Sequence, residues 1–378
     1  MLLITRRKFA AVLAAPLAAR SKLDSILKDG VERRGIPFAA AAVADSKNVL
    51  FQRSAEALFP IASMTKAITS VSAIQLVEQG MVQLDEPVSK HLPVFSSARV
   101  LTGFRGARPR YRPPVRAVTL RHLLTHTSGL CYGAWHEEMA KWDKTAAAKN
   151  AVLPPLQFDP GSRWHYGTGV DWVGRLVEKV SGLSLEEYFQ RKFFRPLGMS
   201  DTSFIVPESK AERVVHMSQR LRDGSLQSIP FKPPQPPKMF NGGGGLFSTA
   251  ADYVKFMQLI LRGGDAETLS PKIVAMLREN AIGPLQAGVL KTTNPERSLD
   301  VDFHPGASDK HTLGFLLNLT PYEGGRASGS LCWAGMFNTY FWIDPANDRC
   351  ATLMMRMLPF VDRECMGLLR EFEKAVYA

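Results

Sequence analysis

The sequence lacks several features that would assign it to large classes of protein. No run of about eighteen apolar residues occurs, so we expect no transmembrane span and no stable membrane insertion. There is no G-x-S-x-G motif, which argues against the nucleophile elbow of an α/β-hydrolase. The run of four glycines after Asn241 lacks the G-K-[ST] ending of a phosphate loop. We interpret that run as a place where the backbone passes close to another segment or takes positive φ.

Cysteine is also scarce, with only four residues and no C-x-x-C pair. This spacing gives no zinc pattern. Cys332 and Cys350 fall in strand-like segments, whereas Cys131 and Cys365 lie elsewhere. A disulfide in an oxidising compartment and buried free thiols both remain open.

Histidine spacing does not complete a metal site. His136 and Glu137 begin an H-E-x-x-H pattern, but position 140 is alanine. His122 and His126 are one helical turn apart with no third ligand nearby, so helix-surface or packing roles are favoured. We therefore predict no metal.

The net charge of +12 has two local sources. The first is a basic N-terminus, where Arg6, Arg7 and Lys8 precede an apolar stretch at 10–19. This pattern resembles a twin-arginine signal, so residues 1–20 are a possible signal peptide and we expect a periplasmic or secreted protein, otherwise a cytoplasmic one.

The second source is an arginine cluster interleaved with glycine and proline. No recognition helix or ladder of stacking aromatics accompanies it, so a solvated hairpin or loop is favoured over a nucleic-acid patch. We expect no nucleic-acid partner. Its members are Arg105, Arg108, Arg110, Arg112 and Arg116.

The order of predicted elements indicates two lobes, as the length of 378 residues suggests. Residues 21–80 and 310–378 would form an α/β lobe, because a helix and two strands begin the chain and several strands and a helix end it. Together they predict one antiparallel sheet built from both termini. Residues 81–309 would form a mainly helical lobe with loops, with predicted helices at 120–127, 137–151, 170–180 and 184–194.

Ser63 and Lys66 form an S-x-x-K motif at the start of a predicted helix. Pro60 precedes them, and apolar residues recur at helical spacing from Ala67 until Gly80 ends the pattern. Positions i and i+3 share one helix face, so the amine can help to remove the hydroxyl proton. Ser63 in the first helical turn would also place unpaired N–H groups near an oxyanion. A plain N-cap role for Ser63 explains the local pattern about equally well.

Other segments favour the catalytic interpretation. From about residue 21 to the C-terminus, the chain resembles the class C β-lactamase-like serine hydrolases, most closely the family VIII carboxylesterases. It is also similar to the fungal acyltransferase that esterifies statin precursors. This resemblance implies an α/β (α+β) fold of the β-lactamase/penicillin-binding-protein type and no metal or organic cofactor. It rests on residues 61–66, 120–130, 164–169, 242–249 and 332–336.

The resemblance also implies catalytic roles. Ser63 would attack the acyl carbon, and Tyr166 would act as general base beside Lys66, because a nearby cation favours the phenolate form of tyrosine. The backbone N–H groups of Ser63 and Met336 would form the oxyanion hole. Water, or an alcohol, would then accept the acyl group.

Two segments depart from the β-lactamases of this group. Where those enzymes have Tyr-x-Asn, this chain has Thr168 in place of the asparagine. Where they have Lys-Thr-Gly, this chain has Trp333, Ala334 and Gly335. In those enzymes the lysine helps to hold the carboxylate of a β-lactam, whereas the tryptophan here would add an apolar wall. We therefore expect these four residues to bind a small neutral ester, and we predict a serine carboxylesterase for short- to medium-chain acyl esters.

Several alternatives remain open at this point. A β-lactamase, a D-amino-acid peptidase or an acyltransferase would use the same fold and the same chemistry. A catalytically silent envelope binding protein belongs to another class, and the presence of Ser63, Lys66 and Tyr166 argues against it. The oligomeric state is not indicated.

Overall fold

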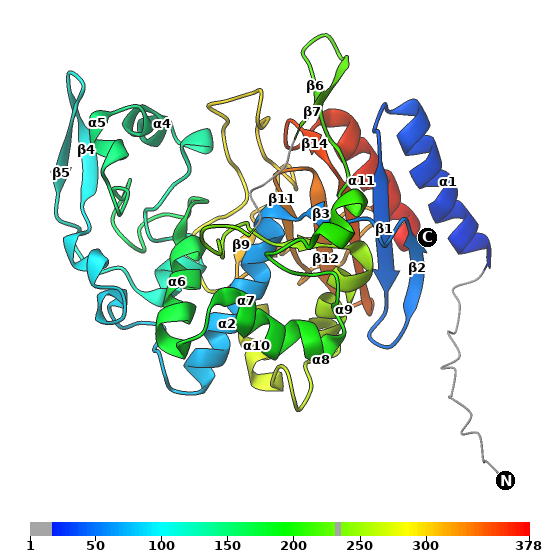
Figure 1. Cartoon of the computed structure of the whole chain (residues 1–378), viewed down its shortest axis with the longest axis horizontal. Helices are drawn as coiled ribbons and strands as arrows, with labels where there is room; N and C mark the ends of the chain where they lie inside the picture. Colours follow the sequence, from blue (N-terminus) through cyan, green and yellow to red (C-terminus); the bar gives the residue numbers. More distant parts are fainter. Residues whose placement is uncertain (1–16, 231–235) are drawn as a thin grey trace.

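A seven-stranded antiparallel sheet forms the centre of the molecule (Figure 1). The structure is a computed structural model that describes residues 17–230 and 236–378. The strand order is β2-β1-β13-β12-β11-β10-β9, so strands from the two ends of the chain are neighbours. This order confirms the predicted fold class. The strands are β1 (Ala39–Ala44), β2 (Val49–Arg53), β9 (Lys310–His311), β10 (Leu316–Leu317), β11 (Leu331–Gly335), β12 (Thr339–Asp344) and β13 (Arg349–Met355).

Helices cover both faces of this sheet. On one face α1 (Leu17–Arg33) and α11 (Arg363–Val376) pack against each other, and the Trp342 ring of β12 contacts Phe372 of α11 at 6.1 Å between centroids. On the other face α9 (Ala250–Leu261) contacts β13 and β1, and its Tyr253 meets Phe341 at 5.1 Å. Residues 341 and 342 point to opposite faces because side chains alternate along a strand.

The middle of the chain forms a second layer of short helices and hairpins around α2 (Thr65–Glu78). It contains α9 as well, which packs on the sheet although it lies within residues 81–309. The lobe boundaries at residues 80 and 310 stay a prediction. The other helices are α3 (Leu120–Leu124), α4 (Glu137–Asp143), α5 (Ala146–Lys149), α6 (Gly169–Ser181), α7 (Leu185–Phe189), α8 (Arg195–Leu197) and α10 (Pro271–Arg278). The remaining strands are β3 (Phe59–Pro60), β4 (Val100–Arg105), β5 (Arg108–Arg112), β6 (Met217–Arg220), β7 (Leu226–Ile229), β8 (Phe247–Ser248) and β14 (Met357–Leu358).

Local capping signals fix several helix starts. A capping box begins α7, with reciprocal hydrogen bonds between Ser184 and Glu187. Thr249 caps α9 by accepting from the Asp252 N–H. The predicted helix at 137–151 is instead two helices, because Thr145 begins a new cap after α4 has ended.

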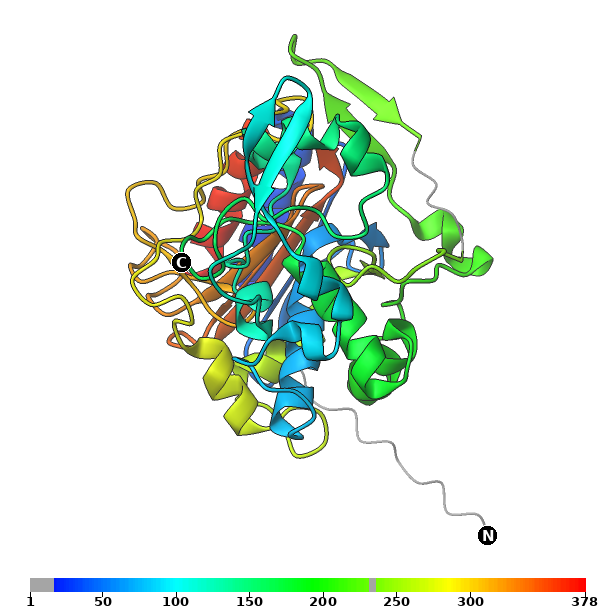
Figure 2. The same cartoon turned by 90° about the vertical axis from the view of Figure 1, so that its left-hand side faces the viewer.

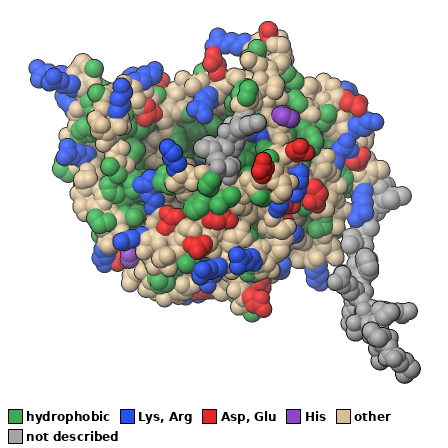
Figure 3. Space-filling view, viewed as in Figure 1, with side chains coloured by type: hydrophobic (Ala, Val, Ile, Leu, Met, Phe, Trp, Pro, Cys, Tyr) green, Lys and Arg blue, Asp and Glu red, His purple; other side chains and the backbone are tan. Residues whose placement is uncertain are grey.

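The arginine cluster lies on the β4–β5 hairpin and the segment after it, and the side chains of its five members are exposed. This hairpin faces the viewer in Figure 2, and basic side chains mark its tip at the upper left of Figure 3. Arg112 pairs with Asp159 at 2.6 Å. The structure therefore agrees with a solvated hairpin.

All four cysteines are buried free thiols. Burial raises the pKa of Cys332 to about 12, so its thiol stays protonated at neutral pH. The sequence left open a disulfide or free thiols, and in the structure the thiols are free.

The predicted signal peptide lies largely outside the described residues, since α1 begins at Leu17. Within the described part of the chain, no helix combines the length and apolar character needed to cross a membrane.

Candidate active site

Ser63 lies in a single 3-10 turn, Ala62–Met64, that leads directly into α2. The sequence predicted Ser63 inside the first α-helical turn, whereas the structure places it in the 3-10 turn that precedes α2. The preceding residue, Ala62, has φ +45°, a conformation that costs energy for a residue with a Cβ. Such strain is common where a reactive side chain must be held in one orientation.

Lys66 is 2% exposed, and its side chain reaches Ser63. Its Nζ donates to Ser63 Oγ at 3.2 Å, to the Tyr132 hydroxyl at 3.2 Å and to the Gly243 carbonyl at 2.5 Å. All three ammonium protons therefore have acceptors, which offsets the cost of burying the charge.

Tyr166 meets the same hydroxyl from the loop before α6. Its OH donates to Ser63 Oγ at 2.5 Å, and Lys66 Nζ lies 5.0 Å from its ring centroid. The loop is held close to a neighbouring segment, since a Cβ on Gly167 would lie 1.7 Å from the Leu130 carbonyl oxygen. The structure thus brings the three predicted catalytic side chains together at one point.

The end of β11 lies against the Ser63 turn. A Cβ on Gly335 would lie 2.4 Å from the Ile61 carbonyl oxygen, so only glycine lets the two backbones approach this closely. Met336, the next residue, lines the same pocket as Ser63. This placement is compatible with an oxyanion hole made by the N–H groups of Ser63 and Met336, which stays a prediction.

The pocket at Ser63 is small and largely apolar, with a volume of about 20 Å³. Trp333 and Ala334 line it as predicted, but Gly335 and Thr168 are not among its lining residues. Thr168 lies at the N-cap of α6, where its buried hydroxyl has no hydrogen-bond partner among the described residues. The lining residues are Ser63, Trp135, Tyr166, Gly288, Leu290, Val301, Phe303, Trp333, Ala334, Met336 and Phe360.

Tyr132 and Asp171 belong to the site but were missed in the sequence. The Tyr132 hydroxyl donates to Asp171 Oδ2 at 3.3 Å while it accepts from Lys66. Burial of this hydroxyl, and then the Asp171 carboxylate, raise the pKa of Tyr132 well above its usual value of about 10, so it stays neutral. The feature of the sequence that indicated a close contact here was the glycine run. In the structure, a Cβ on Gly243 would lie only 2.3 Å from Asp171 Oδ2.

Two buried histidines pack beside Tyr166 and Trp333. The His126 ring contacts Tyr166 at 4.8 Å between centroids, stacks on Trp333 at 6.1 Å and meets His311 at 5.2 Å. Burial lowers the pKa of both histidines, that of His311 to about 4. They are therefore neutral packing groups at pH 7. His122 instead completes a capping box with Thr119 at the start of α3.

This burial predicts an acid-sensitive fold. His311 has a folded pKa of about 4, whereas unfolded histidine titrates near 6.5. Above pH 6.5 both states are neutral, and below it only the unfolded chain gains the proton, so stability falls as the pH drops towards 4. When the pH is lowered from 7 to 4.5, the free energy of unfolding measured in urea should fall in both proteins. The fall should be about 2 kcal/mol smaller in His311→Asn than in the wild type. The exposed His216→Asn should show the wild-type loss, and equal losses in all three proteins would contradict this account.

Comparison with known proteins agrees with this geometry. The profile of the Beta-lactamase family matches residues 23–371. Monacolin J acid methylbutanoyltransferase of Aspergillus terreus is 35% identical over 338 residues, covering 84% of this chain and 81% of that protein. Lovastatin esterase of Penicillium rubens is 32% identical, with 84% of each chain covered.

Solved structures give the same result. Unliganded simvastatin synthase (LovD) of Aspergillus terreus superposes with a TM-score of 0.84 at 29% identity, covering 96% of this chain and 99% of that one. EstCE1, a hydrolase with promiscuous acyltransferase activity, shares the fold at a TM-score of 0.73 and 19% identity. The chain therefore belongs to the beta-lactamase family, and its homologues include acyltransferases and an esterase built on that fold.

Proposed function

We propose that this protein is a serine acyl-transfer enzyme that forms an acyl-enzyme on Ser63 from a small neutral ester. One observation carries the proposal: the Ser63 hydroxyl lies within hydrogen-bond distance of both the Tyr166 hydroxyl and the Lys66 ammonium. Nucleophile and base within this reach are what covalent catalysis needs. An alcohol accepts the acyl group in the principal reaction, and water accepts it in the competing one.

The chemical steps follow from this contact. Tyr166 first loses its hydroxyl proton to solvent, and the resulting phenolate takes the proton from Ser63 while Oγ forms a bond to the acyl carbon. The negative charge that moves from Tyr166 to the carbonyl oxygen is stabilised by Lys66 and by the N–H groups of Ser63 and Met336. Tyr166 then gives the proton to the leaving alkoxide as the ester C–O bond breaks. The acceptor alcohol enters by the same steps in reverse.

The acceptor and substrate class are supported by the relatives and by the lining of the pocket. Monacolin J acid methylbutanoyltransferase transfers a short branched acyl group, as its name states, and aligns over most of both chains. Trp333 lines the pocket and carries no charge for the carboxylate of a lactam or peptide. Hydrolysis of short- to medium-chain esters is the second candidate function, and similarity to lovastatin esterase favours it.

The test separates transfer from hydrolysis. Purified protein is given p-nitrophenyl butyrate with increasing amounts of a bulky secondary alcohol, and the products are measured by mass spectrometry. We expect the butyrate ester of the alcohol to replace butyric acid as the alcohol concentration rises, and nitrocefin to be turned over at least about 100-fold more slowly.

Each other outcome decides between the remaining functions. Butyric acid alone, at every alcohol concentration, would identify an esterase. Nitrocefin turnover comparable with ester turnover would identify a β-lactamase. Absence of all products, together with no labelling of Ser63 by a fluorophosphonate probe, would contradict an active enzyme and favour a binding protein.

A further inference from the structure

A second pocket lies beside the small one at Ser63. It has a volume of about 620 Å³, within the range of about 300–1,000 Å³ that is usual for ligand sites. The Ser63 pocket, at about 20 Å³, has room for roughly one water molecule. The acyl chain of an ester therefore needs space beyond the Ser63 pocket, and the larger pocket is its immediate neighbour.

Phe303 forms part of the wall between the two pockets. Phe303 and Trp333 line both of them. The Phe303 ring contacts Tyr340 of the larger pocket at 6.2 Å between centroids and Phe360 of the Ser63 pocket at 6.1 Å, both edge to face. Phe303 is half-buried and lies in a bend outside the helices and strands. Of the two residues that line both pockets, Phe303 is thus the one outside regular secondary structure, since Trp333 lies in β11.

The larger pocket offers an apolar surface to a ligand. Rings and aliphatic groups from five segments line it, including Tyr322, Tyr340, Met366 and Leu369. Its buried cation, Arg326, is already engaged, because the guanidinium binds the Glu373 carboxylate at 2.7 and 2.8 Å.

The charged side chains at the edge of this pocket are either paired with an opposite charge or exposed to solvent. Arg34 pairs with Glu364 and Glu371 at 2.8 and 2.5 Å. Arg370 and Lys374 lie at the exposed rim. The interior therefore suits a hydrocarbon chain better than an anion.

We propose that the larger pocket binds the distal part of the acyl chain of esters whose carbonyl lies at Ser63, and that Phe303 determines the acyl-chain length. The proposal rests on the proposed function. Short acyl groups react while Phe303 stays in place, and longer ones must displace its ring. Removing the ring joins the two pockets.

The test compares chain-length preference. The ratio of kcat/KM for p-nitrophenyl decanoate to that for p-nitrophenyl butyrate is measured in the wild type, Phe303→Ala and Phe303→Leu. We expect Phe303→Ala to raise this ratio by at least about tenfold, because added methylenes become buried, and Phe303→Leu to raise it less. Adding Met366→Trp to Phe303→Ala should narrow the larger pocket and return the ratio towards the wild-type value.

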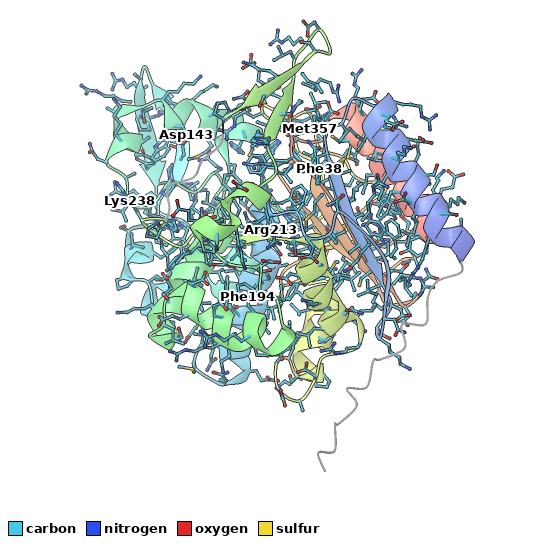
Figure 4. All side chains as sticks on the ribbon, turned by 45° about the vertical axis from the view of Figure 1, so that its right-hand side comes forward. Phe38, Asp143, Phe194, Arg213, Lys238 and Met357 are labelled. Carbon is cyan, nitrogen blue, oxygen red and sulfur yellow. The ribbon has the colours of Figure 1, made fainter. Side chains whose placement is uncertain are left out.

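Phe38→Ala is the matched control, and the Phe38 side chain is labelled in Figure 4. Phe38 is also half-buried, and it lines a different pocket that shares no residue with these two. It should leave the ratio unchanged. An unchanged ratio in both Phe303 variants, with butyrate hydrolysis still dependent on Ser63, would overturn the inference and leave the proposed function intact. A raised ratio that Met366→Trp does not lower would overturn the assignment of the larger pocket. Lack of Ser63-dependent release of p-nitrophenol from the butyrate ester in the wild type, both with and without an acceptor alcohol, would contradict the proposed function instead.

Discussion

Ser63→Ala is expected to lower kcat/KM for p-nitrophenyl butyrate by at least about 10³-fold. The substitution removes the atom on which the acyl-enzyme forms, while Lys66 and Tyr166 keep their positions. No other described hydroxyl is hydrogen-bonded to both of these side chains. Release of p-nitrophenol measures the rate, and intact-protein mass spectrometry measures whether the butyryl adduct on the wild type is lost.

The chain supplies a matched control for this change. Ser25 and Lys28 have the same S-x-x-K spacing, but both are exposed on α1. Ser25→Ala should therefore keep wild-type activity and the butyryl adduct. If Ser63→Ala retained the rate or the adduct, the nucleophile would have to be another residue.

The comparison of these two serines also shows what the sequence can and cannot decide. Spacing alone does not distinguish Ser63 from Ser25, because both satisfy the same helical geometry. The distinction came from distant segments, whose motifs match a family in which this serine reacts. Sheet order was predictable for a related reason, since the strand runs at both ends of the chain have few ways to form one sheet.

Contacts between distant segments could not be predicted in the same way. Tyr132, Asp171 and Gly243 come from three different loops or helix ends, and Tyr132 and Asp171 are ordinary in their own local sequences. They become part of the site only because Lys66 needs acceptors inside a buried space. A sequence pattern records local periodicity, and it carries little information on which tyrosine a buried amine will meet.

Tyr166→Phe is the second large effect that we expect, a loss of about 10²- to 10⁴-fold in kcat for butyrate transfer. The substitution deletes the hydroxyl that contacts Ser63 Oγ and is placed to carry its proton. The ring would keep its contacts with His126 and Trp333, so the fold and the shape of the pocket should be unaffected. Steady-state kinetics measure the loss of kcat, and the unfolding transition in urea measures whether the stability of the fold is unchanged.

Tyr132→Phe is the matched control, because it also deletes a hydroxyl bonded to Lys66. Tyr132 lies between Lys66 and Asp171 and is held neutral, so its loss removes one hydrogen bond to the ammonium but no proton carrier. We expect a loss of about tenfold or less. If the two variants lost the same activity, or if Tyr132→Phe lost more, the general base would be assigned to Tyr132 or to Lys66 itself, and Tyr166 would be a positioning residue.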